Sequence, residues 1–472
     1  MKDDRPSVET HTLAPSSELR VEIPHLPPTS HQSGRGLCTV RLLSGSAELF
    51  GSELATDHPY GFTGSKIAIF SWHGCTIELS GKYDVCYTSD ETNSNVSYVN
   101  THAQLEVLRD DSLKSLSEKE ESKEEKKEGP RVLICGPPDS GKSSLCRTLL
   151  SYATKLHRSP IYVDLDVSSQ TLSVPGTIAA TPVSCGGVNP SSPTGISAGG
   201  DEITPLALWY GDVDVSSSPD LYKSLVAYLG RCVDARMNRD VDAKSSGIIV
   251  NTPGSMNEGG DVGYQLLLNA IEVLRISVVL IMGHDRLYAQ LKNACPNIKV
   301  IKLPRSGGVV SRDVAFRRSN RATSIRRYFH GDIIKSGDNF ANQYTSSAIE
   351  IPLSQVTLYK LVTVDLAASM LPVGQLQSTD PVQIQQIHDF SEGVLHHQVC
   401  AVCHPDAVEK YNSNNEHAGE DKKARDLYLN GVAGFVKVEK VDLDKGILRF
   451  LSPCGGELPS KTLLMGDITW ME

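Results

Sequence analysis

A phosphate-binding loop is the clearest chemical signal in this sequence. The segment from Gly136 to Ser143 has the pattern G-x-x-x-x-G-K-S, and it stands between a short apolar run and a helical pattern. Glycines let such a loop wrap a phosphate closely, and the amide groups at the start of the helix favour its negative charge. We therefore expect Lys142 to reach the β- and γ-phosphates of a nucleotide and Ser143 to hold Mg²⁺. The alternatives are a chance glycine-rich turn and a decayed site that binds nothing.

A carboxylate is expected opposite this loop. The next apolar run ends in Asp164 and Asp166, and strand alternation would place both on one face. Asp166 would lie at the carboxyl end of the strand, where it could order a Mg²⁺-bound water and take a proton from an acceptor hydroxyl. A turn aspartate without a catalytic role is the alternative. Asn251 ends the third run, and because an amide cannot ionise it would be a weaker metal partner.

An arginine-rich segment follows in an otherwise acidic chain. It begins with Arg305 and the pair Gly307-Gly308 and continues through Arg312 and Arg317. Such a segment could close over a triphosphate as a lid and neutralise charge developing on the transferred phosphoryl group. Part of it could also grip an RNA backbone, and the plain alternative is a solvated basic helix. The chain has no N/T-K-x-D base-reading motif, so guanine specificity is not expected.

A cysteine pair near the C-terminal end could be taken for a metal site. Cys400 and Cys403 have the C-x-x-C spacing and are followed by His404. A second, correctly spaced pair is missing, and haem attachment would need an exported protein. The neighbouring valines favour an ordinary β-strand, which is the interpretation we adopt.

Composition limits the class of protein. The 472 residues, of which 39% are hydrophobic, are enough for about three globular domains. No apolar run approaches the ~20 residues that span a bilayer, and the polar start with Asp3 and Asp4 does not resemble a signal peptide. The 11 scattered cysteines are expected to be reduced thiols in the cytosol or nucleus. The net charge of −10 argues against a non-specific DNA coat, but not against a local basic groove.

Changes in periodicity divide the chain. Residues 1–35 are rich in proline and serine, and we expect loose order from the start of this segment. The alternation over 36–100 predicts a small antiparallel β-sandwich. Dense mixed charge over 109–128 predicts a solvated helix or linker. From residue 131 onward, apolar runs alternate with helical stripes, which predicts a parallel sheet with helices on both faces. Residues 184–201 are expected to form a surface insertion and 405–426 a loop.

The chain resembles the eukaryotic pre-mRNA cleavage-complex kinase family, whose members are RNA 5′-hydroxyl kinases and subunits of the cleavage and polyadenylation machinery. The resemblance covers nearly the whole chain and is far more specific than a P-loop alone. Besides the P-loop, it rests on these stretches: Ser17–Arg20, Ala47–Leu54, Lys66–Cys75, Tyr162–Val167, Val174–Thr177, Asp285–Tyr288, Ser306–Val310, Ile325–Gly331, Val432–Phe435 and Leu451–Pro453.

The resemblance implies a multidomain α/β protein that binds ATP and Mg²⁺ between its first two domains. Its implied parts are a β-sandwich at 1–108, a charged linker at 109–130, a P-loop kinase domain at 131–335 and a smaller C-terminal α+β domain at 336–472. By position, Glu18 and Lys66 match adenine-side contacts. Asp166 matches the acidic residue near Mg²⁺ and the acceptor, and Arg312 and Arg317 match lid arginines. The nucleotide set implied is Glu18, Lys66, Gly136, Asp139, Ser140, Gly141, Lys142, Ser143 and Ser144, with Ser143 and Asp166 at the metal.

Two departures from the family pattern bear on catalysis. Active members resemble D-x-G-Q after the second strand, whereas here Gln170 stands one place later and would face the other way in an extended chain. Active members also place a tryptophan that clamps the RNA end where this chain has Ser255. The leading hypothesis is therefore a nuclear, ATP-binding subunit of the pre-mRNA cleavage complex, with other subunits and RNA as partners and no membrane. The alternative is an active RNA 5′-hydroxyl kinase, possibly in tRNA splicing.

Overall fold

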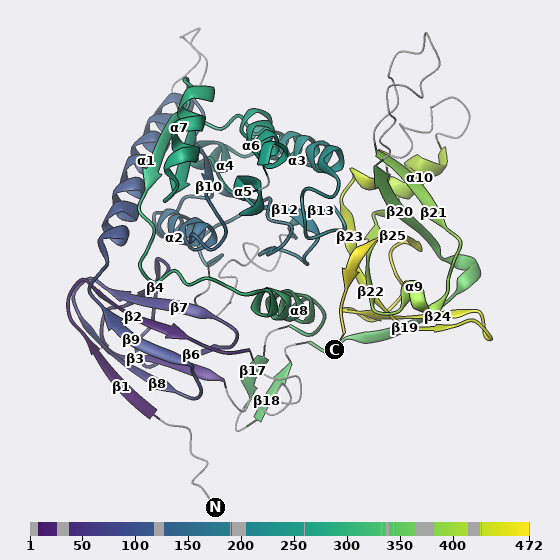
Figure 1. The fold of residues 1–472 in the computed structure, drawn as a ribbon, viewed down its shortest axis with the longest axis horizontal. Helices are drawn as coiled ribbons and strands as arrows, with labels where there is room; N and C mark the ends of the chain where they lie inside the picture. The colour runs from purple at the N-terminus through teal and green to yellow at the C-terminus, as the bar shows by residue number, and fades with distance from the viewer. Residues whose placement is uncertain are drawn as a thin grey trace, which may run out of the picture.

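The computed structural model describes residues 8–25, 37–117, 127–188, 190, 204–258, 260–331, 333–336, 339–342, 344–363, 382–413, 425 and 427–471. These residues form an N-terminal β-sandwich, a central α/β domain and a C-terminal domain built on a sheet, in the predicted order (Figure 1). Among them, no helix combines the length and the apolar character needed to cross a membrane.

Two antiparallel sheets form the N-terminal β-sandwich. Their strand orders are β1-β8-β3-β6 and β5-β4-β7-β2-β9. Alternate residues of β3 and β8 are buried, and the inner faces share a core that includes Leu42, Ile69 and Ile77. The bounds are β1 Val8–Leu13, β2 Ser17–Glu22, β3 Cys38–Gly45, β4 Glu48–Leu49, β5 Ser52–Glu53, β6 Pro59–Phe62, β7 Lys66–Ser71, β8 Cys75–Ser80 and β9 Val85–Ser89.

The sandwich begins earlier than the alternation over 36–100 predicted. We expected loose order over 1–35, but β1 and β2 both lie before residue 23. β2 is an inner strand of its sheet because it pairs with both β7 and β9. Its polar residues Glu18 and Arg20 are buried along with Leu19 and Val21, so the strand shows no alternation. The remaining part, 1–7 and 26–35, lies outside the described residues.

A long helix, α1 (Asn93–Ser117), joins the sandwich to the central domain and packs against α2 and α4. Residues 109–117 are thus helical, one of the two expected forms, but they are not fully solvated. Arg109 is 1% exposed, pairs with Glu106 and donates a 2.9 Å hydrogen bond to the carbonyl of Ser246. These partners make the burial of a guanidinium tolerable. Residues 118–126 of the expected linker lie outside the described residues.

A seven-stranded sheet of order β13-β12-β11-β14-β10-β15-β16 forms the centre of the α/β domain in the described residues. The five strands from β11 to β16 are parallel, as predicted. The prediction of a parallel sheet is wrong at the other edge, where β12 pairs antiparallel with β11 and β13. β12 follows β11 with no crossover helix between them, and such a direct return produces antiparallel pairing.

Helices cover both faces of this sheet, as predicted. Along β10, Val132 and Ile134 join a core with α1 and α2, whereas Leu133 and Cys135 join a second core with α3 and α6. The bounds are β10 Arg131–Cys135, α2 Lys142–Lys155, β11 Ile161–Asp164, β12 Thr177–Pro182, β13 Leu206–Trp209, α3 Pro219–Arg239, α4 Val241–Ser246, β14 Ile248–Asn251, α5 Ser255–Glu258, α6 Gly260–Val273, β15 Val278–Met282, α7 Asp285–Ala294, β16 Lys299–Leu303 and α8 Val314–His330. Of the expected insertion, 189 and 191–201 lie outside the described residues.

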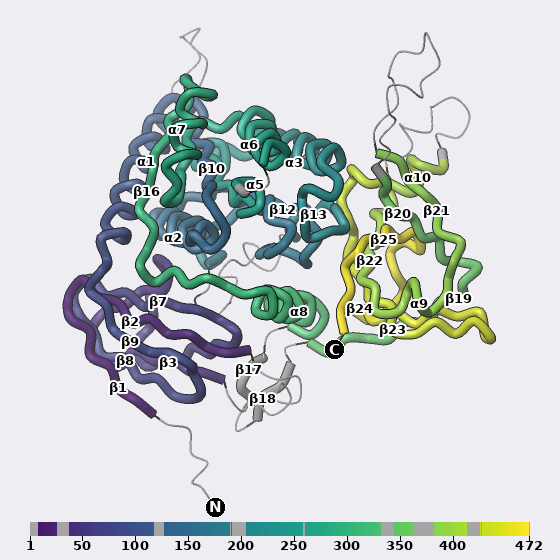
Figure 2. Tube along the Cα trace, viewed as in Figure 1, coloured from purple at the N-terminus to yellow at the C-terminus, as the bar shows by residue number. Residues whose placement is uncertain are grey.

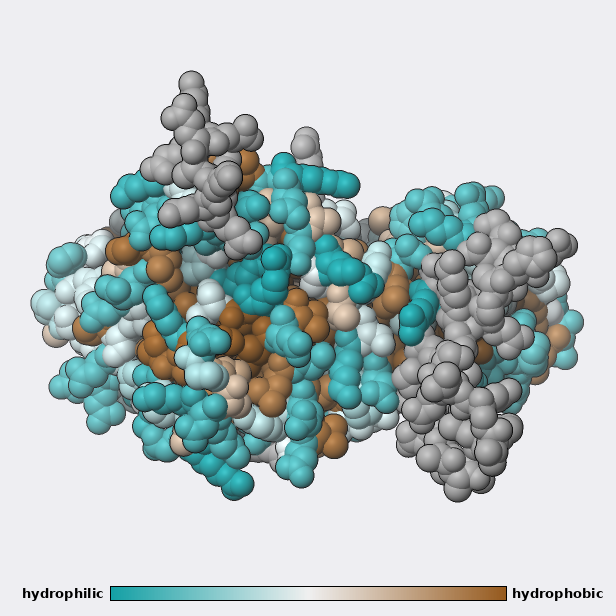
Figure 3. Space-filling model, turned by 90° about the horizontal axis from the view of Figure 1, so that it is seen from above, coloured by the Kyte–Doolittle hydropathy of each residue, from teal (hydrophilic) through white to brown (hydrophobic). Residues whose placement is uncertain are grey.

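The C-terminal domain forms a separate lobe beside the rest of the molecule (Figure 3). Its sheet has the order β19-β24-β23-β22-β25-β20-β21, and a two-stranded ribbon of β17 and β18 precedes it. The expected loop at 405–426 is wrong at its start, because residues 405–413 form α10; the rest is largely outside the described residues. The bounds are β17 Ile333–Ser336, β18 Asn339–Asn342, β19 Ser347–Pro352, η2 Leu353–Gln355, β20 Thr357–Thr363, β21 Val382–Ile387, α9 Glu392–Leu395, β22 Gln398–Cys403, α10 Pro405–Ser413, β23 Val432–Asp442, β24 Ile447–Ser452 and β25 Thr462–Thr469.

The cysteine pair lies on β22, so the predicted strand is confirmed. Cys400 and Cys403 pack into different apolar cores, because residues three apart on a strand point to opposite faces. Burial raises the pKa of both thiols to about 12. Two sulfurs on opposite faces cannot hold one ion together.

Helix α8 connects all three domains. The chain from β16 passes beside the β-sandwich before it enters α8 (Figure 2). At the other end of the helix, the ring of Phe329 stacks on Trp470 at 5.5 Å, and Tyr328 accepts a 2.9 Å hydrogen bond from the amide of Phe435. The C-terminal domain therefore anchors the end of the arginine-rich helix, while its start lies at the P-loop.

Candidate nucleotide-binding and active site

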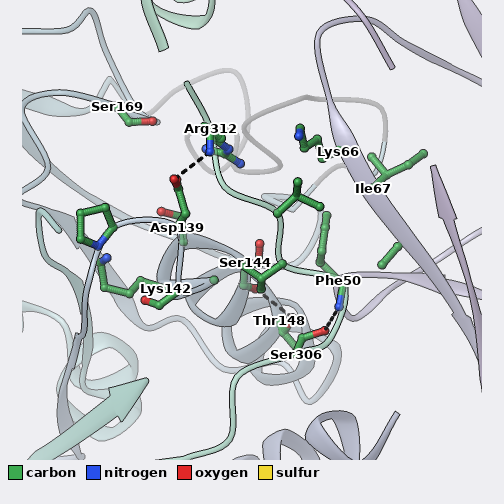
Figure 4. Close-up of a pocket in the computed structure, with 18 of the residues that line it drawn as sticks. Phe50, Lys66, Ile67, Asp139, Lys142, Ser144, Thr148, Ser169, Ser306 and Arg312 are labelled. Atoms are coloured by element: carbon green, nitrogen blue, oxygen red, sulfur yellow. Dashed lines mark hydrogen bonds between the residues drawn. The ribbon is translucent and has the colours of Figure 1, made fainter. Parts of the chain in front are cut away.

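A cavity of about 550 Å³ lies between the β-sandwich and the P-loop domain. Strands β2, β4 and β7 form one wall, the P-loop and α2 form the other, and the start of α8 closes over them. Figure 4 shows Lys66 and Ile67 facing Asp139 and Lys142 across this space, with Arg312 between the two sides. The cavity is lined by these residues from the sequence-predicted set: Glu18, Lys66, Asp139, Ser140, Gly141, Lys142, Ser143, Ser144, Asp166, Arg312 and Arg317.

The P-loop has the shape of a phosphate cradle. Gly136, Asp139 and Gly141 have φ angles of 149°, 51° and 90°, which turn the backbone around the loop. Lys142 is 7% exposed, and its ammonium donates a 2.8 Å hydrogen bond to the carbonyl of Pro137. Burial lowers the pKa of Lys142. The hydroxyl of Ser140 is buried and has no hydrogen-bond partner among the described residues, so a polar ligand such as a phosphate suits the loop.

The arginine-rich lid is hydrogen-bonded to the P-loop through the carboxylate of Asp139. Oδ2 of Asp139 accepts hydrogen bonds from the backbone amide of Arg312 at 2.9 Å and from Nη2 of Arg317 at 2.5 Å. The second contact is also an ion pair, and Arg317 is 39% exposed. The structure thus brings both predicted lid arginines to the phosphate side of the cavity.

The Gly-Gly pair before α8 permits a close approach by another part of the chain. The guanidinium of Arg20, on β2, lies against this pair, and a Cβ added at Gly308 would come within 2.9 Å of Arg20 Nε. Arg20 also pairs with Glu18 at 2.5 Å, so it lies between the expected adenine contact and the lid. Sequence reasoning missed Arg20, although the stretch Ser17–Arg20 was part of the family resemblance.

The two aspartates of the second strand do not share a role. β11 ends at Asp164, which is wholly buried and accepts hydrogen bonds from Asn251 Nδ2 at 3.0 Å and from the amide of Asp166 at 3.1 Å. Burial and the charge of Asp166 raise the pKa of Asp164 to about 6. The expectation that both lie on one strand face is wrong, because Asp166 stands beyond the strand. Asp166 lines the cavity and accepts hydrogen bonds from the amide and hydroxyl of Ser168 at 3.0 and 2.8 Å.

Both departures from the family pattern lie near the part of the site where the RNA end would bind. Gln170 is 2% exposed, and its amide donates to the carbonyls of Thr177 and Asp164 at 3.0 and 3.3 Å, so it faces away from the cavity. The orientation is the predicted one, but the extended strand assumed for it ends at Asp164. Ser255 starts α5 and lines the cavity. Its hydroxymethyl group offers no aromatic face for a base.

The wall that β2, β4 and β7 form, which is the side expected to meet the adenine base, contains further groups that sequence reasoning did not single out. Glu48 and Phe50 belong to the β4–β5 hairpin, which rests on α2, and both line the cavity. The hydroxyl of Tyr152 donates a 2.6 Å hydrogen bond to Glu48, whose pKa is raised by burial. Lys66 pairs with Glu22 at 2.8 Å. This wall is therefore rich in carboxylates, which suits ligand groups that donate hydrogen bonds.

Three family models match successive parts of the chain. A model of the mRNA cleavage and polyadenylation factor CLP1 P-loop matches residues 136–331. A model of the N-terminal beta-sandwich domain of polyadenylation factor matches residues 12–112, and one of pre-mRNA cleavage complex II protein Clp1 matches residues 346–472.

Named relatives are similar over their whole length. The chain is 34% identical over 476 residues to a protein CLP1 homolog from Aedes aegypti, with 100% of both chains covered. It is 32% identical over 472 residues to the human polyribonucleotide 5′-hydroxyl-kinase Clp1, with 100% of this chain and 98% of the human one covered. A solved complex of Clp1p with Pcf11p has the same fold, with a TM-score of 0.76 and 23% identity over 99% of each chain.

Proposed function

Because this chain belongs to the Clp1 family of pre-mRNA cleavage complex II proteins, we propose that it is an ATP-binding subunit of the pre-mRNA 3′-end cleavage and polyadenylation machinery. The observation that carries the proposal is the cavity whose walls come from two domains and whose cover comes from the lid. A nucleotide held there would contact all three elements at once. By mass action it would favour the one arrangement of domains that binds it.

Each part of ATP has suitable groups in the cavity. Lys142 and the P-loop amides suit the β- and γ-phosphates, and the carboxylate of Glu18 suits the amino group of adenine. The hydroxyl of Ser143 and the carboxylate of Asp166 are oxygen ligands of the kind that Mg²⁺ prefers. When bound, Mg²⁺ would offset negative charge on the phosphates. We also propose that the protein acts in the nucleus. Its domains are the β-sandwich up to residue 108, the linker up to 130, the P-loop domain up to 335 and the C-terminal domain after it.

The family also supplies a partner. The solved relative is a complex of Clp1p with Pcf11p, and its fold matches this chain. We propose that this protein likewise binds another subunit of the complex on the surface that nucleotide stabilises. RNA would then reach the protein as the substrate of the whole assembly.

The experiment that tests this proposal measures nucleotide and partner binding together. Calorimetric titration with ATP–Mg²⁺ and GTP–Mg²⁺ should show a clear preference for ATP. Capture of a Pcf11-type partner fragment should then be stronger with ATP than without nucleotide. Equal affinity for the two nucleotides would contradict the adenine assignment, and partner capture that ignores nucleotide would contradict the coupling.

A second function, RNA 5′-hydroxyl kinase, is favoured by the placement of Lys142, Asp166 and Arg317 around one cavity. In this reaction the 5′-oxygen of RNA bonds to the γ-phosphorus, the bond to the β-phosphate oxygen breaks, and ADP leaves. Asp166 would take the hydroxyl proton, and Arg317 would neutralise charge on the transferred group. Ser255 and Gln170 weigh against efficient turnover, because Ser255 offers the RNA end no aromatic face and Gln170 faces away from the cavity.

Restoring an aromatic residue should separate the two functions. We expect Ser255→Trp to raise phosphorylation of a 5′-hydroxyl oligoribonucleotide about tenfold or more, since base stacking on an aromatic side chain contributes about 1–3 kcal/mol. The measurement is transfer of labelled γ-phosphate at limiting RNA. Ser255→Leu adds bulk without an aromatic face and is the matched control. If the Trp and Leu proteins are equally slow, the missing stacking surface is not what limits the reaction.

A further inference from the structure

Phe316 occupies an unusual place at the start of the lid helix. Its amide bonds to the side chain of Asp313, which caps α8, so its backbone position is fixed. The ring is half-buried, and it is absent from the set of residues that line the cavity. Any effect of Phe316 on a ligand must therefore pass through other side chains.

Two cations of the cavity wall lie over this ring. The ammonium of Lys66 is 5.4 Å from the ring centroid, and the guanidinium carbon of Arg312 is 5.7 Å from it. Both distances are within the ~6 Å at which an aromatic ring attracts a cation. Lys66 comes from the sandwich strand β7 and Arg312 from the lid, and both line the cavity. The ring therefore connects the base side of the cavity with the lid.

The β-sandwich also contacts the Phe316 ring through His25. The imidazole of His25 is 4.9 Å from the Phe316 ring, and its Nδ1 lies 3.3 Å from the hydroxyl of Thr323, almost two turns further along α8. His25 itself packs against Gly64, where any added Cβ would overlap the imidazole. Burial and the charge of Arg312 lower the pKa of His25. A lowered pKa favours the neutral imidazole, so Lys66 and Arg312 are the two cations that lie near the ring.

We propose that Phe316 is a positioning residue for nucleotide binding: its ring holds Lys66 and Arg312 in place and so couples contact with the base to closure of the lid. The inference rests on the proposed binding of ATP in this cavity. An exposed cation–π contact changes an equilibrium about two- to fivefold. Because the ring serves two cations, losing it should weaken ATP binding about fivefold.

The experiment compares four side chains at position 316 by calorimetric titration with ATP–Mg²⁺. Phe316→Leu keeps the apolar bulk and should bind about fivefold more weakly, whereas Phe316→Tyr and Phe316→Trp keep the ring and should bind within about twofold of the unmodified protein. Tyr228→Leu is the matched control, because it removes a ring that lies under Arg231 at 5.5 Å on α3, away from the cavity. Thermal unfolding without nucleotide checks that each variant is folded.

A double-mutant cycle decides whether the ring acts through the cations. In a Lys66→Met or an Arg312→Met protein, the further change Phe316→Leu should weaken ATP binding only about twofold, because one of the two contacts is already lost. A full fivefold loss in both backgrounds would mean that Phe316 acts by packing alone, which overturns the inference. So would equal binding by the Leu and Phe proteins. If the unmodified protein binds no ATP, the proposed function fails instead.

Discussion

Replacing Lys142 by alanine should weaken ATP binding by about two to three orders of magnitude. Lys142 is 7% exposed at the start of α2, where the amide groups of the loop suit an anion. Removing one partner of a buried, hydrogen-bonded charge pair costs about 2–5 kcal/mol, and 1.4 kcal/mol corresponds to a factor of ten. Calorimetric titration with ATP–Mg²⁺ measures the loss directly.

The matched control is Lys223→Ala on α3. Lys223 is 41% exposed and pairs with Asp220 at 3.1 Å, and such surface pairs contribute little. The Lys223→Ala protein should bind ATP with the affinity of the unmodified protein. A Lys142→Ala protein that binds ATP within about fivefold of normal would show that the loop is not the phosphate site.

The same variant distinguishes the structural role of ATP from a catalytic one. If nucleotide holds the sandwich, the P-loop domain and the lid together, partner capture should fall along with ATP binding. If ATP is only a substrate, Lys142→Ala should abolish phosphoryl transfer while partner capture survives. The two outcomes are read from one protein preparation.

The P-loop could be predicted from the sequence because its chemistry is local. Eight consecutive residues set both the backbone path and the side chains of the cradle, so no distant contact was needed to find Lys142 and Ser143. The helices on both faces of the central sheet could also be predicted, since the change from period 2 to period 3.6 is a local signal. The β-sandwich was found in the same way from strands such as β8, which alternate buried and half-buried residues.

What the sequence did not reveal depends on contacts between distant segments. Arg20 reaches Gly308 from a strand almost three hundred residues earlier, and no local pattern marks that approach. The search for alternating residues missed β2, because its polar residues face the cavity and are buried on the same strand as its apolar ones. The end of β11 was misplaced because Asp164 satisfies its hydrogen bonds inside the protein, through Asn251. A strand boundary of that kind is set by a neighbouring strand.

These distant contacts give the lid a physical description. Its start is bonded to Asp139 on the P-loop, the glycine pair before it packs against Arg20, and its far end is stacked on Trp470. A basic helix held at three points is not merely solvated. Its arginines could act on the phosphoryl group during transfer or only on bound nucleotide, and these two roles predict different kinetics.

Replacing Arg317 by alanine should distinguish these two roles. If the protein is a kinase, the variant should lower kcat about a thousandfold, the order that a transition-state arginine contributes, while ATP affinity changes less than tenfold. The reason is that Arg317, which is 39% exposed and bonded to Asp139, would meet charge that develops only during transfer. Single-turnover transfer of labelled phosphate to 5′-hydroxyl RNA at saturating ATP gives the rate, in the Ser255→Trp protein if the unmodified one is too slow.

Arg318→Ala is the control for this measurement, because Arg318 is the next residue of α8 but is exposed and does not line the cavity. The two variants remove the same charge from the same helix turn, so any general effect of helix charge on RNA attraction is common to both. A difference between them must therefore come from the position of the guanidinium relative to the reacting phosphoryl group. If both variants transfer phosphate at the same rate, the arginine-rich segment acts only as a basic surface, and the kinase mechanism loses its lid.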